Sequence, residues 1–164
     1  MAHPIPWSEF QSEAPDLARR GRELFDRHQL CMLGTLRGDG SPRISPCEMD
    51  YAAGELLMGM MWRSLKAIDL LRDPRCVLHS CTTDKAGTEG DFKLYGHAID
   101  VTQSALLDAY VTAIKERTDW TPPQPFHVFA IGITSAAYVV FGDQRQWMTW
   151  DPDRGVRKGV QREV

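Results

Sequence analysis

The sequence has no hydrophobic run that approaches the roughly 20 residues needed to cross a bilayer. It also has no excess of positive charge: the net charge is -3, which gives no general attraction to nucleic acid. The first ten residues, MAHPIPWSEF, lack the charged and apolar segments of a signal peptide. We therefore expect a cytoplasmic protein with neither membrane nor nucleic acid among its partners.

No CxxC pair occurs among the four cysteines, which are Cys31, Cys47, Cys76 and Cys81. Three of them lie in apolar runs, so buried free thiols are expected rather than a redox or metal centre. His79 shares one face of an expected strand with Cys81, but nothing else in the sequence completes a zinc site. No metal is predicted.

The sequence also lacks internal repeats and the glycine-rich turn of a dinucleotide-binding fold. The GDG segment at 38–40 precedes a strand and not a helix, which indicates a hairpin turn with Asp39-Gly40 at its tip. The length of 164 residues, with 43% hydrophobic and 25% charged residues, fits one globular domain over 1–164.

Hydrophobic periodicity predicts three helices and a series of short strands. The helices are expected at 15–28, 64–72 and about 103–117. The strands are expected at 30–37, 42–51, 55–62, 75–81, 92–101 and 127–141, with a bulge at Gly132. A further short strand at 146–152 precedes a charged tail.

Six antiparallel strands with helices in the crossovers indicate a mainly β, α+β fold built on a small barrel. The expected organisation is an N-terminal helix at about 15–28, a barrel at about 30–150 and a short C-terminal tail.

The junction between the strand ending at Trp62 and the helix at 64–72 gathers two cations and a hydroxyl. Ser64 stands where a helix N-cap is expected, with Arg63 and Lys66 beside it. The first turn of a helix attracts anions, and Arg43 on a neighbouring strand adds a further charge. The group suits a phosphate, although the same pattern is also typical of an ordinary capped surface helix.

The surroundings of this junction are more specific. The segment GDGSPRISP, then a glycine-containing strand, then R-S-x-K-A-x-x-L-x-x-D-P resembles the FMN-binding split-barrel superfamily, which includes pyridoxamine 5'-phosphate oxidase and the deazaflavin-dependent reductases. The resemblance covers about residues 30–101, including the strand DFKLYGHAIDV. It implies a split β-barrel that forms a homodimer, with the flavin in a groove between the two subunits.

The resemblance also implies a cofactor site. Residues 43–45 would lie beside the isoalloxazine and phosphate, residues 59–62 would line the ring and ribityl chain, and Ser64 and Lys66 would hold the phosphate. Gly59 would let a flat ring approach the backbone closely. The full set is Arg43, Ile44, Ser45, Gly59, Met60, Met61, Trp62, Arg63, Ser64, Lys66 and Trp147.

Two tryptophans near the C-terminus have an open role. In the family this region often covers the partner's flavin, which suits Trp147. Packing within a dimer, or capping of the core edge, explains Trp147 and Trp150 equally well. The histidines His79, His97 and His127 are expected to be structural.

The chain departs from the oxidase pattern at several positions. Glu48 stands where the oxidase has a lysine, and Leu65 stands where its phosphate-binding run has an arginine. The oxidase's C-terminal substrate-binding arginine motif is not evident in GVRKGVQREV. Oxidation of pyridoxamine phosphate is therefore not predicted.

Three functions stay open. The first is an FMN-dependent oxidoreductase that acts on a small molecule, with substrate, electron donor and catalytic residues undetermined. The second replaces FMN with the deazaflavin F420, whose longer anionic tail needs more cations. The third is a flavin- or haem-binding protein without turnover, which the glutamate at position 48 favours. The candidate cations for an F420 tail are Arg19, Arg20, Arg22 and Arg27.

Overall fold

The computed structural model describes residues 3–162, which form an antiparallel β structure with four helices. The helices are α1 (Trp7–Glu13), α2 (Pro15–His28), α3 (Leu65–Arg72) and α4 (Ser104–Thr118). Within these residues no helix combines the length and the apolar character needed to span a membrane.

The strands belong to one nine-stranded sheet whose pairings are all antiparallel. They are β1 (Cys31–Leu36), β2 (Pro42–Cys47), β3 (Asp50–Ala52), β4 (Glu55–Met61), β5 (Arg75–Ser80), β6 (Asp91–Asp100), β7 (Phe126–Val140), β8 (Gln144–Asp151) and β9 (Gly155–Arg162). The order β2-β1-β5-β6-β7-β4-β3 forms the main path, and β8 and β9 continue from β7.

Six of these strands form the split barrel that the sequence predicts. They run β2-β1-β5-β6-β7-β4, and contacts between β2 and β4 bring the two ends of the path together. The mainly β, α+β fold class is therefore confirmed.

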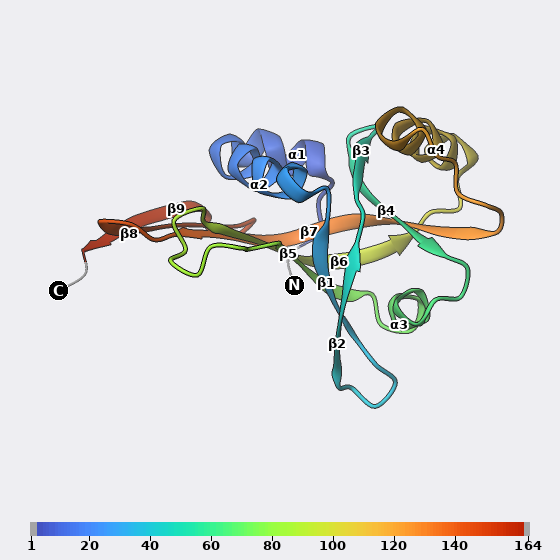
Figure 1. Cartoon of the computed structure of the whole chain (residues 1–164), viewed down its shortest axis with the longest axis horizontal. Helices are drawn as coiled ribbons and strands as arrows, with labels where there is room; N and C mark the ends of the chain where they lie inside the picture. The colour runs from blue at the N-terminus through green and yellow to red at the C-terminus, as the bar shows by residue number, and fades with distance from the viewer. Residues whose placement is uncertain (1–2, 163–164) are drawn as a thin grey trace.

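The long strand β7 serves two parts of the molecule. Its first half pairs with β4 in the barrel, and its second half pairs with β8. Figure 1 shows β8 and β9 leaving the barrel as an extended arm, with the C-terminus at its far end and α3 on the other side of the molecule. The barrel and the arm are therefore joined by continuous strand pairing.

Helix α2 covers the barrel because its apolar residues recur on one face. Leu17, Leu24 and Phe25 are buried, and the ring of Phe25 packs edge-on against Phe92 of β6 at 5.3 Å between centroids. Gly21 lies in the same face, where an added Cβ would stand 2.3 Å from the Phe92 ring. The absence of a side chain at this position brings α2 close to the sheet.

The hydrophobic interior has two parts. The larger cluster fills the barrel and extends beneath α1 and α2. A smaller cluster lies between α4 and the outer face of β4 and β7, with Leu57, Tyr110 and Val128 among its members. Helix α4 thus covers a sheet face that the barrel itself leaves exposed.

The structure corrects several local expectations. The charged tail forms strand β9, because it pairs with β8 from Gly155 to Arg162. The expected strand at 42–51 divides into β2 and β3, and α1 has no counterpart among the predicted elements. The β6–β7 register shifts between Tyr95 and Gly96, so the bulge does not lie at Gly132.

Five residues, 37–41, join β1 to β2, and the loop closed by the hydrogen bond from the amide of Arg37 to the carbonyl of Ser41 has three residues rather than two. The N–H of Gly40 donates to the carbonyl of Arg37, and Gly40 has φ +83°. This is a type I turn followed by a left-handed residue, which is a common three-residue hairpin connection.

Candidate functional site

The junction between β4 and α3 is a tight backbone turn. The amide of Ser64 donates to the carbonyl of Met61 at 3.1 Å, and Arg63 between them has φ +54°. A positive φ is uncommon for a residue other than glycine and often marks a functional segment. The carbonyl of Ser64 then accepts the first helical hydrogen bond, from the amide of Ile68 at 2.9 Å.

The Ser64 hydroxyl is an orphaned polar group at the start of α3. Its Oγ is shielded from solvent and has no hydrogen-bond partner among the described residues, and it does not cap the helix. A buried hydroxyl without a partner is costly, so its position favours an acceptor supplied from outside the chain. The unsatisfied N–H groups of the first helical turn make an anion the most suitable acceptor.

Lys66 links α3 to β2. Its Nζ donates to the carbonyl oxygen of Pro46 at 2.7 Å, which holds the ammonium group beside the barrel. A neutral carbonyl leaves the positive charge of Lys66 uncompensated. Within residues 3–162, Arg63 also makes no ion pair, so two uncompensated cations flank Ser64 in the sequence.

Arg43 has a carboxylate partner that the sequence analysis missed. Its Nε donates to Oδ2 of Asp69 at 2.6 Å, and the same oxygen accepts from Oγ1 of Thr35 at 3.0 Å. Nη1 of Arg72 lies 3.6 Å from the other carboxylate oxygen. The Asp69 side chain is 5% exposed, so one buried carboxylate joins β1, β2 and α3.

The environment of Asp69 favours its charged form. Burial by itself raises the pKa of the carboxyl, but hydrogen bonds from Arg43 and Thr35 and the charge of Arg72 outweigh burial. The pKa of Asp69 is therefore lowered from its ordinary value. Arg43 retains its two terminal nitrogens for an external anion, while its charge is shared with Asp69.

An exposed apolar surface surrounds the junction. Met61 at the end of β4 is 79% exposed, and Ile44 on β2 is 71% exposed. Leu65, the first residue of α3, is exposed as well. Ser45, which follows Ile44 on β2, is half-buried. Large exposed apolar side chains in a group mark an interaction surface.

A cleft of about 450 Å³ lies between this junction and the start of β7. It is lined by apolar and cationic side chains and by His127, whose ring stacks on Trp62 with 4.3 Å between centroids. His127 is buried, and its Nε2 has no partner among the described residues. This stacked pair was not predicted, because its members lie 65 positions apart in the sequence.

Two of the predicted site residues lie elsewhere than expected. Met60 is a buried member of the barrel core, so its side chain does not line the surface. Gly59 faces α4, where an added Cβ would stand 1.8 Å from the hydroxyl oxygen of Tyr110. The packing of Tyr110 therefore requires glycine at position 59. The space beside the Gly59 backbone, which was expected to admit a flat ring, is occupied by the Tyr110 side chain on this face.

The two C-terminal tryptophans differ in their surroundings. Trp150 is 1% exposed, packs against Phe10, and donates from Nε1 to Glu13 at 3.2 Å, so it is a core residue. Trp147 is partly exposed on β8, in the arm that extends away from α3 (Figure 1). Within one chain, Trp147 is therefore not brought to the junction.

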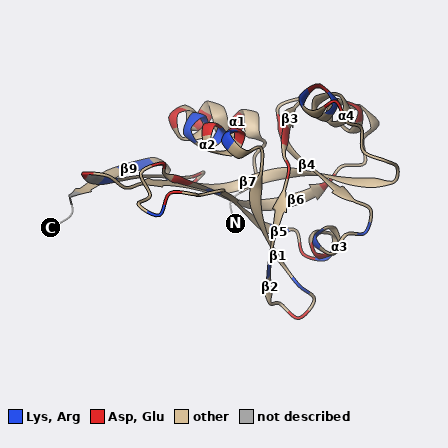
Figure 2. Cartoon of the chain, viewed as in Figure 1, with Lys and Arg blue, Asp and Glu red and all other residues tan. Residues whose placement is uncertain are grey.

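The arginines of α2 are largely compensated within the chain. Arg19 pairs with Asp16 and Glu23, Arg22 pairs with Asp26, and Arg27 lies 3.4 Å from Glu89. Figure 2 shows the resulting mixture of both charge signs along α2. Arg20 has no carboxylate within ion-pair distance among the described residues.

Glu48 has a local partner on α4. Nη2 of Arg117 donates to Glu48 at 2.9 Å, and the same guanidinium donates to both oxygens of Asp50. The hydrogen bonds that Arg117 donates to Asp50 and Glu48 outweigh the effect of burial and raise the pKa of Arg117. The glutamate that departs from the oxidase pattern is thus part of an ion-pair network between β3 and α4.

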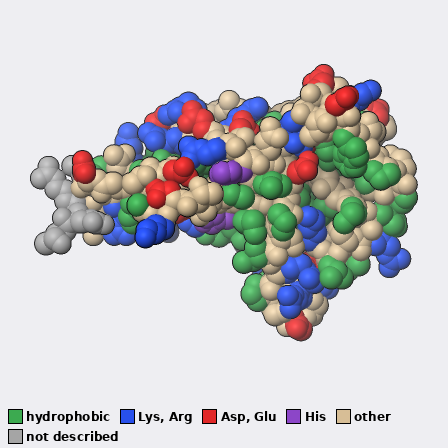
Figure 3. Space-filling model, viewed as in Figure 1, with side chains coloured by type: hydrophobic (Ala, Val, Ile, Leu, Met, Phe, Trp, Pro, Cys, Tyr) green, Lys and Arg blue, Asp and Glu red, His purple; other side chains and the backbone are tan. Residues whose placement is uncertain are grey.

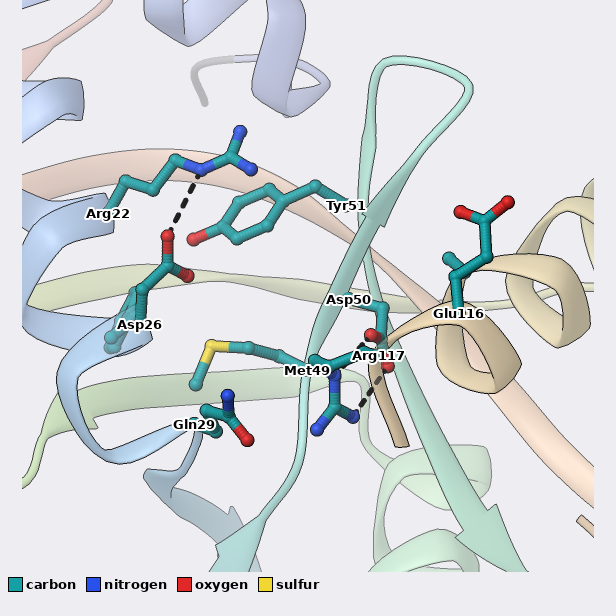
Figure 4. Close-up of a pocket in the computed structure, with 10 residues that line it drawn as sticks. Arg22, Asp26, Gln29, Met49, Asp50, Tyr51, Glu116 and Arg117 are labelled. Atoms are coloured by element: carbon teal, nitrogen blue, oxygen red, sulfur yellow. Dashed lines mark hydrogen bonds and ion pairs between the residues drawn. The ribbon is translucent and has the colours of Figure 1, made fainter. Parts of the chain in front are cut away.

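This network borders a cleft of about 500 Å³, which lies between α2, β3 and α4 (Figure 4). Figure 4 shows Arg117 directed at Asp50, and Arg22 at Asp26, so both cations of the cleft are occupied. The Tyr51 hydroxyl is buried without a partner among the described residues. The cleft offers no uncompensated positive charge, which makes it less suitable for phosphate than the junction.

The described residues contain no group of three or more side chains suited to a metal ion. Nδ1 of His79 donates to the carbonyl of Ser80 at 2.6 Å, and Sγ of Cys81 lies 3.6 Å from the carbonyl of Leu30. Cys31, Cys47 and Cys76 are free and buried as expected, and burial raises the pKa of each thiol.

A family model described as "Pyridoxamine 5'-phosphate oxidase" matches residues 17–140, which include every element of the junction. The chain belongs to this family. The superfamily suggested by the sequence is thereby confirmed. No curated protein matches the chain.

Three solved structures share the fold at low identity. An FMN-binding protein related to pyridoxamine 5'-phosphate oxidase from Nostoc punctiforme PCC 73102 has 12% identity and a TM-score of 0.62, covering 94% of this chain and 97% of its own. PhzG from Burkholderia lata 383, in complex with tetrahydrophenazine-1-carboxylic acid, has 10% identity and a TM-score of 0.63, covering 93% of each chain. A heme-binding protein from Mycobacterium smegmatis has 12% identity and a TM-score of 0.62, covering 92% of this chain and 89% of its own.

Replacing Asp69 with asparagine is expected to destabilise the fold at pH 7 by about 1.5–3 kcal/mol, the usual range for hydrogen bonds to a charged group. Because the folded pKa of Asp69 is lowered from 3.8, the stabilisation is full above that value and is lost as pH falls through the folded pKa. Urea unfolding between pH 3 and pH 7 measures the difference.

The matched control is Asp108→Asn, at an exposed position of α4 without an ion pair in the described chain. The free energy of unfolding of Asp108→Asn should equal that of the natural chain at every pH. A difference between the natural chain and Asp69→Asn that grows toward acid pH would contradict the assigned ion pair.

Proposed function

We propose that the chain is a flavoprotein that binds FMN with its phosphate at the start of α3. The observation that carries this proposal is the buried, unpartnered hydroxyl of Ser64 at a helix N-terminus. The uncompensated charges of Lys66 and Arg63, and the remaining nitrogens of Arg43, supply the positive field that a phosphate dianion needs. Membership of the family, with an FMN-binding structural relative, supports the choice of cofactor.

The residues around the phosphate would then orient the rest of the cofactor. FMN, when bound, supplies hydride and electron transfer through its own ring system. The backbone of residues 59–62 and the exposed side chains of Ile44, Met61 and Trp62 would border the ring and ribityl chain. The residues at the junction offer binding and positioning, and oxidation or reduction of a small molecule is the activity we infer.

The same proposal requires a second copy of the chain. On one chain the ring would rest on the exposed apolar surface of Ile44, Met61 and Leu65, with no element above it. A homodimer covers that surface and encloses the cofactor in a groove between subunits, which removes apolar area from water. Membership of the family supports this arrangement.

A second candidate is carriage of a flavin without turnover. The pairs Arg43–Asp69 and Glu48–Arg117 favour it, because each compensates a charge near β2 within the chain. Binding of F420 has less support, because three of the four candidate arginines of α2 are paired with carboxylates. Haem binding rests on the relative from Mycobacterium smegmatis and on His127, which is already stacked on Trp62.

Replacing Ser64 and Lys66 together with alanine is expected to weaken FMN binding by roughly 100-fold or more. Each contact to the charged phosphate contributes about 1.5–3 kcal/mol, and about 1.4 kcal/mol corresponds to a factor of ten. Quenching of flavin fluorescence measures the affinity. The control variant Lys85→Ala removes a cation from an exposed loop and should leave it unchanged. Equal affinity of the double variant and the natural chain would refute the phosphate assignment.

Replacing Met61 with glutamate is expected to yield monomers and to abolish tight FMN binding. A charge on the most exposed apolar residue of the junction is costly to bury between subunits. Sedimentation velocity over a dilution series measures the assembly. The control Thr112→Glu adds the same charge to an exposed site on α4. A natural chain that is monomeric at micromolar concentration, yet binds FMN tightly, would defeat the shared groove.

A further inference from the structure

A separate cavity of about 330 Å³ lies beside the β8–β9 arm. Its lining comes from α2, β7, β8 and β9, and it includes none of the residues of the β4–α3 junction. Figure 1 shows the arm and α3 on different sides of the molecule. Cavities of a few hundred cubic ångströms are large enough for a small organic ligand.

The cavity contains the arginine of α2 that lacks a carboxylate. Arg19, Arg22 and Arg27 are each paired within the chain, whereas Arg20 instead extends over the ring of Tyr138, 5.2 Å from its centroid. The Nε of Arg20 is shielded from solvent and has no hydrogen-bond partner among the described residues. A shielded guanidinium nitrogen without an acceptor points to an anion supplied from outside the chain.

A second cation reinforces this charge. Lys158 of β9 lines the same cavity and has no ion pair in the part of the chain that the structure describes. Asp16 also lines the cavity, but it lies 3.2 Å from Arg19, which offsets its charge. The cavity therefore has a positive balance, and Figure 2 marks Lys and Arg positions on both α2 and β9.

Aromatic side chains give the cavity a flat wall. Trp147 lies directly over Gly159, where an added Cβ would stand 2.5 Å from the indole ring. The glycine thus allows the indole to lie against β9, and Trp147, which is 36% exposed, is among the lining residues of the cavity. Tyr138, beneath Arg20, is a second aromatic member of the lining. Aromatic walls of this kind bind planar rings by offset stacking or edge contact.

We propose that this cavity binds a small aromatic carboxylate. The carboxylate would pair with Arg20 and Lys158, and the aromatic ring would pack against Trp147. A guanidinium and an ammonium group suit the two oxygens of a carboxylate, and the cavity leaves room for one or two fused rings. The lining shares no residue with the β4–α3 junction of the same chain, so the two proposals are tested by different substitutions.

The test uses the full-length protein and 2-naphthoate, followed through the indole N–H signals of its five tryptophans by NMR. The variant Trp147→Phe identifies the Trp147 signal by its loss. We expect 2-naphthoate to shift the Trp147 signal in a saturable manner. The uncharged amide, 2-naphthamide, should bind at least tenfold more weakly.

Matched variants separate the site from general charge effects. Arg20→Gln and Lys158→Gln should each weaken binding at least tenfold. Arg27→Gln, on the same helix but paired with Glu89 and outside the cavity lining, should leave affinity unchanged. The variant with Ser64 and Lys66 replaced by alanine should bind 2-naphthoate like the natural chain.

Three results would overturn the proposal. The first is an unshifted Trp147 signal at saturation, and the second is equal affinity for 2-naphthamide. The third is loss of naphthoate binding in the Ser64 and Lys66 variant, which would place the ligand at the β4–α3 junction. Loss of FMN binding alone in that variant would concern only the flavin proposal.

Discussion

The buried carboxylate of Asp69 is the interaction on which the candidate site depends. It accepts hydrogen bonds from Thr35 on β1 and from Arg43 on β2, so it ties α3 to the two strands beside it. A charge so deeply buried is stable only with such partners, so the positions of Asp69, Thr35 and Arg43 relative to one another are tightly constrained. Arg72 adds to the connection, because it donates to the carbonyl of Leu36 at the end of β1. The start of α3, and with it Ser64, is thereby held at a fixed place beside the barrel.

The distribution of compensated and uncompensated charge then distinguishes the possible ligand sites. Around the cleft between α2, β3 and α4, Arg117 is engaged by Glu48 and Asp50, and Arg22 is engaged by Asp26. At the junction, the cations lie beside an unpartnered hydroxyl and the unsatisfied amides of a helix terminus. Figure 3 shows hydrophobic surface and basic side chains side by side over the barrel end of the molecule. Phosphate on an otherwise flat, apolar cofactor matches that combination.

Sequence reasoning succeeded where the signal is local. The periodicity of 15–28 predicted α2 residue for residue, and the change of pattern at Trp62 placed the β4–α3 junction correctly. It failed where the cause lies far along the chain. Nothing adjacent to Gly59 reveals that Tyr110 fills the space beside it, and β9 is a strand only because β8 offers it a partner. The partnership of Arg43 with Asp69 was missed for the same reason, since it joins residues on different elements through the fold.

The most direct test of the account compares the affinities of the purified natural chain for FMN and for riboflavin, which differ only in the phosphate. Isothermal titration calorimetry measures both under the same conditions. If the start of α3 binds the phosphate, FMN should bind at least 100-fold more tightly, which corresponds to about 2.8 kcal/mol from charge-assisted contacts. Equal affinity for the two compounds, or no binding of FMN at all, would contradict the assignment of the junction as a phosphate site.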